Sequence, residues 1–228
     1  MKSRNHFLFM LFVFFWFPSV YIWGGSIPQD PDPAYTQIIQ QRAQKIVDTL
    51  DITDDDKALQ VRNIISDQYR SLSMLHDTRD AQIQAAVSRL DDNKELADHV
   101  IQVLRDMTQA LQDQLHVHYL VKLSVPLNSE QIDQVKDGMT YGVVQVTYNS
   151  YLEMLPDLTD EQKKKIMDYL IEAREIAMDA GSSDEKHAWF GKYKGRINNY
   201  LSAQGYNLKK ASEERNQRSR STSGQENQ

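Results

Sequence analysis

The sequence contains no cysteine, although its N-terminus has the composition of an export signal. This absence excludes disulfide bonds, thiolate catalysis and cysteine-ligated zinc, and it excludes a lipid anchor attached to a leader cysteine. The packing of side chains therefore has to stabilise the fold.

Glycine and proline are both absent from Ala34 to Val125. Apolar residues recur there at intervals of three and four, which predicts helices. The polar signals that can separate these helices are Thr53 with Asp56, which resembles a capping box, and the turn ending at Asn93. We expect one helix over 34–50, then two long helices that pair as an antiparallel hairpin. The apolar side of the third helix, which we expect to pack on the second, is Leu96, Val100, Val103, Leu104, Met107, Leu111 and Val121.

Basic residues are in the minority. There are 26 Lys and Arg against 32 Asp and Glu, so the formal net charge is −6. Nonspecific binding to a nucleic acid requires a basic surface, and we predict no nucleic-acid partner.

Long apolar runs occur only at the N-terminus, where two basic residues precede the run from Phe7 to Trp23 and small residues follow at 24–26. This pattern predicts a cleavable signal peptide over 1–26, followed by an extended lead over 27–33. No membrane segment remains after cleavage, so we expect a periplasmic or secreted protein.

The remaining residues predict further capped helices in one all-α domain over 34–210. Asn128 with Gln131, Thr159 and Ser183 begin helices, and Gly205 ends the last one. A connector over 140–148 carries β-branched residues and glycine, which favour an irregular or extended backbone.

The C-terminal segment 211–228 is predicted to be a disordered tail. No apolar residue follows Ala211, so its side chains cannot compensate for the entropy lost on ordering.

The stretch from Ser183 to Tyr206 is the richest in aromatic and basic residues. On a helix, one sector of about 120° holds Trp189, Phe190, Tyr193, Ile197, Tyr200 and Leu201. Gly191 and Gly195 lie near the opposite side, where each weakens the helix, so we expect another helix or a ligand to approach the backbone there.

A binding site for an acidic sugar is one interpretation of this stretch. Trp189, Tyr193 and Tyr200 would stack on sugar rings, while Lys192 and Arg196 would meet a carboxylate. Two further residues of the candidate site are Lys186 and His187. The alternative is that the two cations pair with Glu172 or Glu175 of the preceding helix, as part of the fold.

Metal binding is not predicted. His116 and His118 point about 160° apart on a helix and cannot chelate one ion, and His118 is expected to be a hydrogen-bonded core residue. The acidic run from Asp54 to Asp56 lacks the glycine of a calcium loop and suits a helix N-terminus. We predict no cofactor.

Two segments, VKDGMTYGVVQVTYNSYLEMLPDLTDEQ at 135–162 and DAGSSDEKHAWFGKYKGRINNYLSAQGYNLKK at 179–210, resemble an exported Bacteroidetes family catalogued as domain of unknown function 3826. The family has no established activity. The resemblance implies a context of exported machinery that degrades complex glycans.

Three functions stay open on this basis. The first is an accessory protein that binds carbohydrate without catalysis. The second is a helical scaffold or chaperone-like module that binds other exported proteins, which an exposed apolar groove on the hairpin would favour. The third is a glycan lyase or hydrolase. The base and cation types that a lyase needs occur among Lys186, His187, Lys192, Tyr193 and Arg196, whereas a hydrolase would need two of the carboxylates Glu153, Asp157, Glu172 and Glu175.

Overall fold

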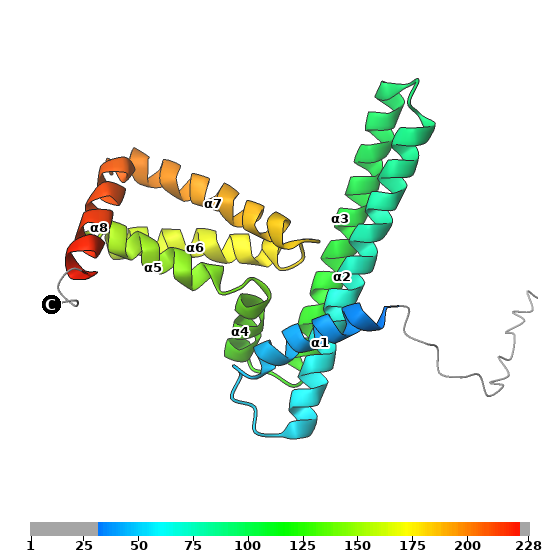
Figure 1. Ribbon diagram of the computed structural model, residues 1–228, viewed down its shortest axis with the longest axis horizontal. Coiled ribbons are helices and arrows are strands. Elements are labelled where there is room, and N and C mark those ends of the chain that lie inside the picture. The colour runs from blue at the N-terminus through cyan, green and yellow to red at the C-terminus, as the bar shows by residue number, and fades with distance from the viewer. Residues whose placement is uncertain (1–31, 224–228) are drawn as a thin grey trace, which may run out of the picture. The chain divides into compact units, whose positions relative to one another are not determined.

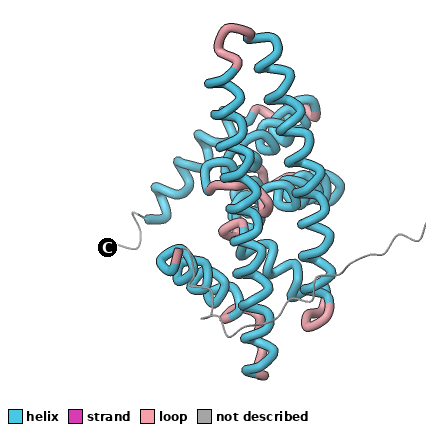
Figure 2. The backbone as a smooth tube through the Cα atoms, turned by 90° about the vertical axis from the view of Figure 1, so that its right-hand side faces the viewer, coloured by secondary structure: helices cyan, strands magenta, loops and turns pink. Residues whose placement is uncertain are grey.

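The computed structural model describes residues 32–223, which form helices and loops without any strand (Figure 2). The chain divides between Pro33 and Ala34, and the residues from Ala34 onward form one compact unit. The predicted signal peptide and most of the predicted lead lie outside the described residues. The single all-α domain is confirmed.

Eight helices make up the described residues (Figure 1): α1 (Pro33–Val47), α2 (Asp55–Arg89), α3 (Lys94–Ser124), α4 (Ser129–Met139), α5 (Val143–Met154), α6 (Asp160–Ala177), α7 (Ser183–Ala203) and α8 (Leu208–Ser223). The expected hairpin is present, because α2 and α3 lie side by side along their lengths. Helix α6 packs between α5 and α7, and α8 packs on α5 and α7.

Polar caps fix most of the helix starts. Both capping boxes are complete, with Asn128 and Gln131 at α4 and with Thr159 and Gln162 at α6. Two predicted caps are wrong by one residue. Asp54, not Thr53, accepts a hydrogen bond from the Lys57 amide at the start of α2, and Ser182, not Ser183, caps α7. A carboxylate or hydroxyl one position away serves the same amide groups, so sequence alone does not separate these alternatives.

Two apolar cores stabilise this unit. The first is formed by α1 to α4, with Val61, Ile65, Leu123 and Val135 at its centre. The second is formed by α5 to α8, and its most buried residues include Ile166, Leu170, Ala173, Phe190, Ile197 and Leu201. The end of α6 belongs to both, because Ala177 lies in the second core and the adjacent Met178 in the first.

The predicted extended connector over 140–148 is wrong. A turn with positive φ at Tyr141 and Gly142 leads directly into helix α5 at Val143. Val144, Thr147 and Tyr151 are buried at helical spacing. The burial of these side chains outweighs the few tenths of a kcal/mol by which β-branched residues disfavour a helix.

The C-terminus differs from the predicted disordered tail, because residues 208–223 form α8. Leu208 and Ala211 at its start pack on the second core. Farther along, the Arg218 side chain donates a hydrogen bond to the Glu153 carbonyl at the end of α5. The polar composition of this segment predicts disorder, but the apolar first turn holds the polar helix in place. Residues 224–228 lie outside the described part of the chain.

The expectation that another helix approaches the backbone at Gly191 and Gly195 is also wrong. A Cβ atom at either position would meet nothing within 4 Å among the described residues. The tightly packed glycines are Gly138, where a Cβ would lie 2.7 Å from Ile46 Cγ1, and Gly181, where it would lie 2.8 Å from His76 Cγ. These two glycines admit a neighbouring side chain.

The contrast predicts opposite effects for the same substitution. Gly191→Ala and Gly195→Ala should each raise the free energy of unfolding by about 0.5–1 kcal/mol, because alanine restricts the unfolded chain and favours the helix. Gly181→Ala should lower it, since the His76 ring is hydrogen-bonded at both nitrogens and cannot easily move. Thermal or urea unfolding measures both changes. A lower melting temperature for Gly191→Ala would show that its backbone is in contact after all.

Candidate functional site

The aromatic face of α7 is the side that carries Trp189, Tyr193 and Tyr200. Parts of this face are buried and hydrogen-bonded within the protein, which a sugar-binding site does not require. Tyr193 is buried, and its hydroxyl donates a 2.7 Å hydrogen bond to Glu172 Oε1. Lys186 is also buried, and its ammonium donates to the carbonyls of Ala177 and Met178 at the end of α6. Burial lowers the pKa of Lys186 to about 8. Both residues of the predicted site therefore have partners within the protein.

The remaining residues of the predicted site lie at the surface, but cations cover several of the rings. Arg196 Nη1 lies 3.1 Å from Glu172 Oε1, and the guanidinium stands 4.9 Å and 4.6 Å from the ring centroids of Tyr169 and Tyr193. Hydrogen bonds from Tyr193 and Arg196 lower the pKa of Glu172. The alternative pairing is thus the one seen for Arg196.

Lys192 and Tyr200 belong to the same face. The Lys192 ammonium lies 4.6 Å from the Trp189 ring centroid, and the Tyr200 ring makes an edge contact with Tyr169. His187 is stacked on Tyr141, away from these contacts. A sugar that stacked on Trp189 or Tyr193 would have to displace a cation already held there.

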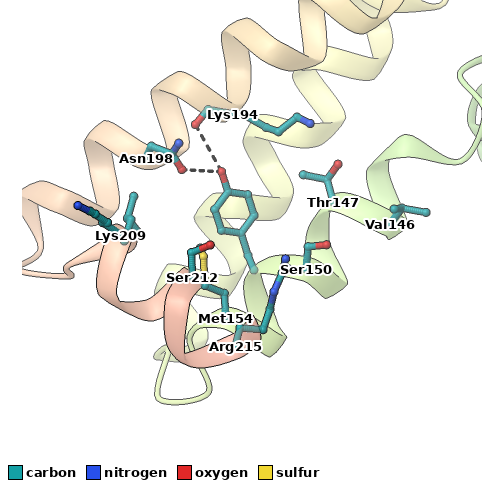
Figure 3. Close-up of a pocket in the computed structure, with 11 residues that line it drawn as sticks. Val146, Thr147, Ser150, Met154, Lys194, Asn198, Lys209, Ser212 and Arg215 are labelled. Atoms are coloured by element: carbon teal, nitrogen blue, oxygen red, sulfur yellow. Dashed lines mark hydrogen bonds between the residues drawn. The ribbon is translucent and has the colours of Figure 1, made fainter. Parts of the chain in front are cut away.

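A different pocket, among α5, α7 and α8, is open and basic (Figure 3). Its volume is about 460 Å³, and it is lined by Val146, Thr147, Ser150, Tyr151 and Met154 of α5, Lys194 and Asn198 of α7, and Leu208, Lys209, Ser212 and Arg215 of α8. Among these described residues there are three cations and no carboxylate. We call this the α5/α7/α8 pocket.

Each wall of this pocket has a local explanation. Lys209, Ser212 and Arg215 recur every three residues on one side of α8, and Lys194 and Asn198 are one turn apart on α7. Tyr151 fixes the α7 wall, because its hydroxyl donates to Asn198 Oδ1 at 2.7 Å and lies 3.4 Å from the Lys194 carbonyl (Figure 3). Burial raises the pKa of Tyr151 to about 12, so this hydroxyl stays a donor at all ordinary pH values.

Two cations of the pocket differ from Arg196 on the aromatic face. Within the described residues neither Lys194 nor Lys209 forms an ion pair, whereas Arg196 pairs with Glu172. Figure 3 shows Lys194 extending toward Thr147, while Arg215 lies beside Ser150. Ammonium and guanidinium groups beside hydroxyl and amide side chains form a site that can hold a hydroxylated anion.

A second polar cluster lies where α2, α3, α4 and α6 meet. The buried Asp179 carboxylate accepts a 2.6 Å hydrogen bond from His116 Nδ1 and a longer one from Gln68, and its backbone carbonyl accepts from His76 Nε2. The hydrogen bond to Asp179 raises the pKa of His116.

Ion pairs between α4 and α6 extend this cluster. Arg174 is buried between Asp133 and Asp137, at 2.7 Å and 2.9 Å, and Lys136 Nζ lies 2.7 Å from Glu175 Oε2. His118, predicted to be a core histidine, is instead exposed on the opposite side of α3. Among the described histidines the buried one is His76, which no sequence pattern distinguishes.

Among the described residues, no group of three or more histidines and carboxylates is arranged to hold a metal ion. No helix in residues 32–223 is long and apolar enough to cross a membrane.

Comparison with known proteins decides the family. The sequence pattern described as protein of unknown function (DUF3826) matches residues 36–221. The chain belongs to the DUF3826 family. The match includes every residue that lines the α5/α7/α8 pocket and every residue of the Asp179 cluster. A search of curated proteins finds no match.

The His116–Asp179 pair predicts a pH dependence for this DUF3826 protein. Because the folded-state pKa of His116 is raised, the ion pair contributes fully below the unfolded pKa of about 6.5, and this contribution is lost as the pH rises through the folded-state value. The difference in unfolding free energy between the wild type and His116→Gln should therefore be larger at pH about 6 than at pH about 9. Urea unfolding at the two pH values measures it. A difference that is unchanged or grows with pH would contradict the assignment.

Proposed function

We propose that this protein is an exported accessory protein of complex-glycan utilisation that binds an acidic sugar chain without catalysis, and that the α5/α7/α8 pocket is its binding site. The observation that carries this proposal is the set of three cations in a pocket whose described lining contains no carboxylate. The chain as a whole is acidic, with a formal charge of −6, so its average composition does not account for the set.

The chemistry of the lining supports a carbohydrate. Lys194 and Lys209 can meet carboxylates spaced along a chain, and Thr147, Ser150, Ser212 and Asn198 offer hydroxyl and amide groups to sugar hydroxyls. Val146, Met154 and Leu208 supply apolar surface for the C–H face of a sugar ring. A largely preformed cleft of this kind is the usual form of a small-ligand site.

The context supports the rest of the proposal. The leader at 1–26 predicts export, and the resemblance to the DUF3826 family implies glycan-degrading surroundings. The predicted site on α7 has less support than the pocket, since Lys186 and Tyr193 are buried and Arg196 is paired with Glu172. We therefore place the ligand on the opposite side of α7.

Substitutions on the two sides of α7 separate these sites. Lys194→Gln and Lys209→Gln should each weaken binding of an oligogalacturonide roughly 10-fold, because each removes a charge-assisted hydrogen bond of about 1.5 kcal/mol. Raising the salt concentration should weaken binding of the wild type. Isothermal titration calorimetry measures both effects.

Arg196→Ala and Lys192→Gln are the matched controls, since they remove cations from the other face of α7. They should bind like the wild type. If Arg196→Ala abolishes binding while the two pocket variants retain it, the site is the aromatic face. A wild type that binds neither an oligogalacturonide nor a sulfated oligosaccharide would rule out the proposal.

One observation favours the second candidate, a helical scaffold that binds proteins. An apolar strip on α3 is exposed to solvent, as this function would require.

A further inference from the structure

The apolar side of α3 does not pack on α2 as expected from the sequence. Six residues of this side are exposed, with exposed fractions from 43 to 77 %, and they are separated by four, seven or ten residues, which keeps them on one side of a helix: Leu96, Val103, Met107, Leu111, Val121 and Val125. Helix α3 instead meets α2 through neighbouring positions such as Ala97 and Thr108, which are buried. We call the exposed positions the α3 stripe.

Charge is missing from the α3 stripe over its whole length. Its positions from Leu96 to Val125, with Val100, Gln114 and His118 in the same register, include no Asp, Glu, Lys or Arg, although these make up 25 % of the chain. A helix face that remains in water normally carries charged residues, whereas a spacing of three and four apolar residues is typical of a helix that packs on another helix.

The hairpin also lacks a third layer along much of its length. Among residues 77–107, which are all described, Ala97 is the one buried residue. Two helices alone leave one apolar side of each uncovered, which is why stable bundles contain at least a further helix or a second hairpin.

The stripe carries both a projecting side chain and a groove that fits one. Met107 is 59 % exposed, and one turn along α3 a groove of about 640 Å³ opens between the two helices. Its apolar lining is Met74, Leu75, Leu111 and Leu115. Because the projection and the groove are on the same face and about one turn apart, a two-fold axis between Met107 and Leu111 would bring each Met107 over the groove of the other copy.

We propose that the α3 stripe is the contact surface for a second copy of this chain, with the two hairpins pairing antiparallel as a four-helix bundle. The pairing around this axis sets Met107 against Leu111 and Leu96 against Val121 of the other copy. The exposed side chains of the stripe and Met74 present roughly 500 Å² of apolar surface per copy. A symmetric pair would then bury about 1,000 Å², which is the lower limit for a biological interface.

Sedimentation of the full chain, as isolated from the expressing cell, tests the pairing. The wild type should sediment as a dimer at micromolar concentration. Met107→Lys and Leu111→Lys should each raise the dimer dissociation constant roughly 100-fold or more, because symmetry places each new charge in the interface twice. Val87→Lys is the matched control. Val87 is similarly exposed but on the other side of α2, and its substitution should leave the dimer intact.

Spin-label distances determine the orientation of the two copies. The chain has no cysteine, so Gln109→Cys and Gln102→Cys each give one labelled site per copy. In the antiparallel pair the axial separation between labels grows by about 3 Å for each residue away from the two-fold axis. The separation along the axis should therefore be about 20 Å greater at position 102 than at position 109, whereas a parallel pair would give equal values.

A wild type that stays monomeric at tens of micromolar would overturn the proposal, as would a dimer that Met107→Lys leaves intact. A monomer that binds an unfolded protein through the stripe, with Met107→Lys abolishing that binding, would also overturn it and assign the surface to client proteins.

Discussion

The hydrogen bonds to the buried Asp179 carboxylate are the interactions on which the joining of the two cores depends. It lies just after α6, between a core formed by α1 to α4 and a core formed by α5 to α8. A carboxylate that is 3 % exposed is stable only when partners replace its water, and His116 from α3 and Gln68 from α2 supply them. Removal of either partner would leave a buried charge incompletely solvated. The polar cluster thereby fixes the end of α6 against the hairpin.

The position of α7 follows from this attachment. Lys186, in the first turn of α7, donates to the last carbonyls of α6, and Gly181 lets the chain pass directly over the His76 ring. With its start held in this way, α7 buries Phe190, Ile197 and Leu201 against α6. One flank then carries Trp189 and Arg196, and the other carries Lys194 and Asn198. On the first flank Arg196 pairs with Glu172 and lies over the Tyr169 ring, whereas the second flank faces the α5/α7/α8 pocket.

Features with a local cause could be predicted from the sequence. The capping boxes at Asn128 and Thr159 act within four residues, and the hairpin follows from the absence of glycine and proline over 34–125. Features that depend on distant partners could not. His116 and Asp179 are 63 residues apart, and the exposure of Met107 depends on which side of α3 meets α2.

The α5/α7/α8 pocket could not be predicted for a related reason. Lys209, Ser212 and Arg215 fall in or beside a segment whose polarity indicated disorder, and the helix that aligns them is held by Leu208 and Ala211.

The central claim is that an acidic sugar chain occupies the α5/α7/α8 pocket and not the aromatic face of α7. The most direct measurement is an amide chemical-shift map of the ¹⁵N-labelled protein during titration with an oligogalacturonide. The account predicts that the largest shifts occur at Thr147, Ser150, Lys194, Asn198 and Ser212, with small changes at Trp189 and Lys192. Shifts concentrated at Trp189, Lys192 and Arg196, or no shifts at saturating ligand, would contradict it.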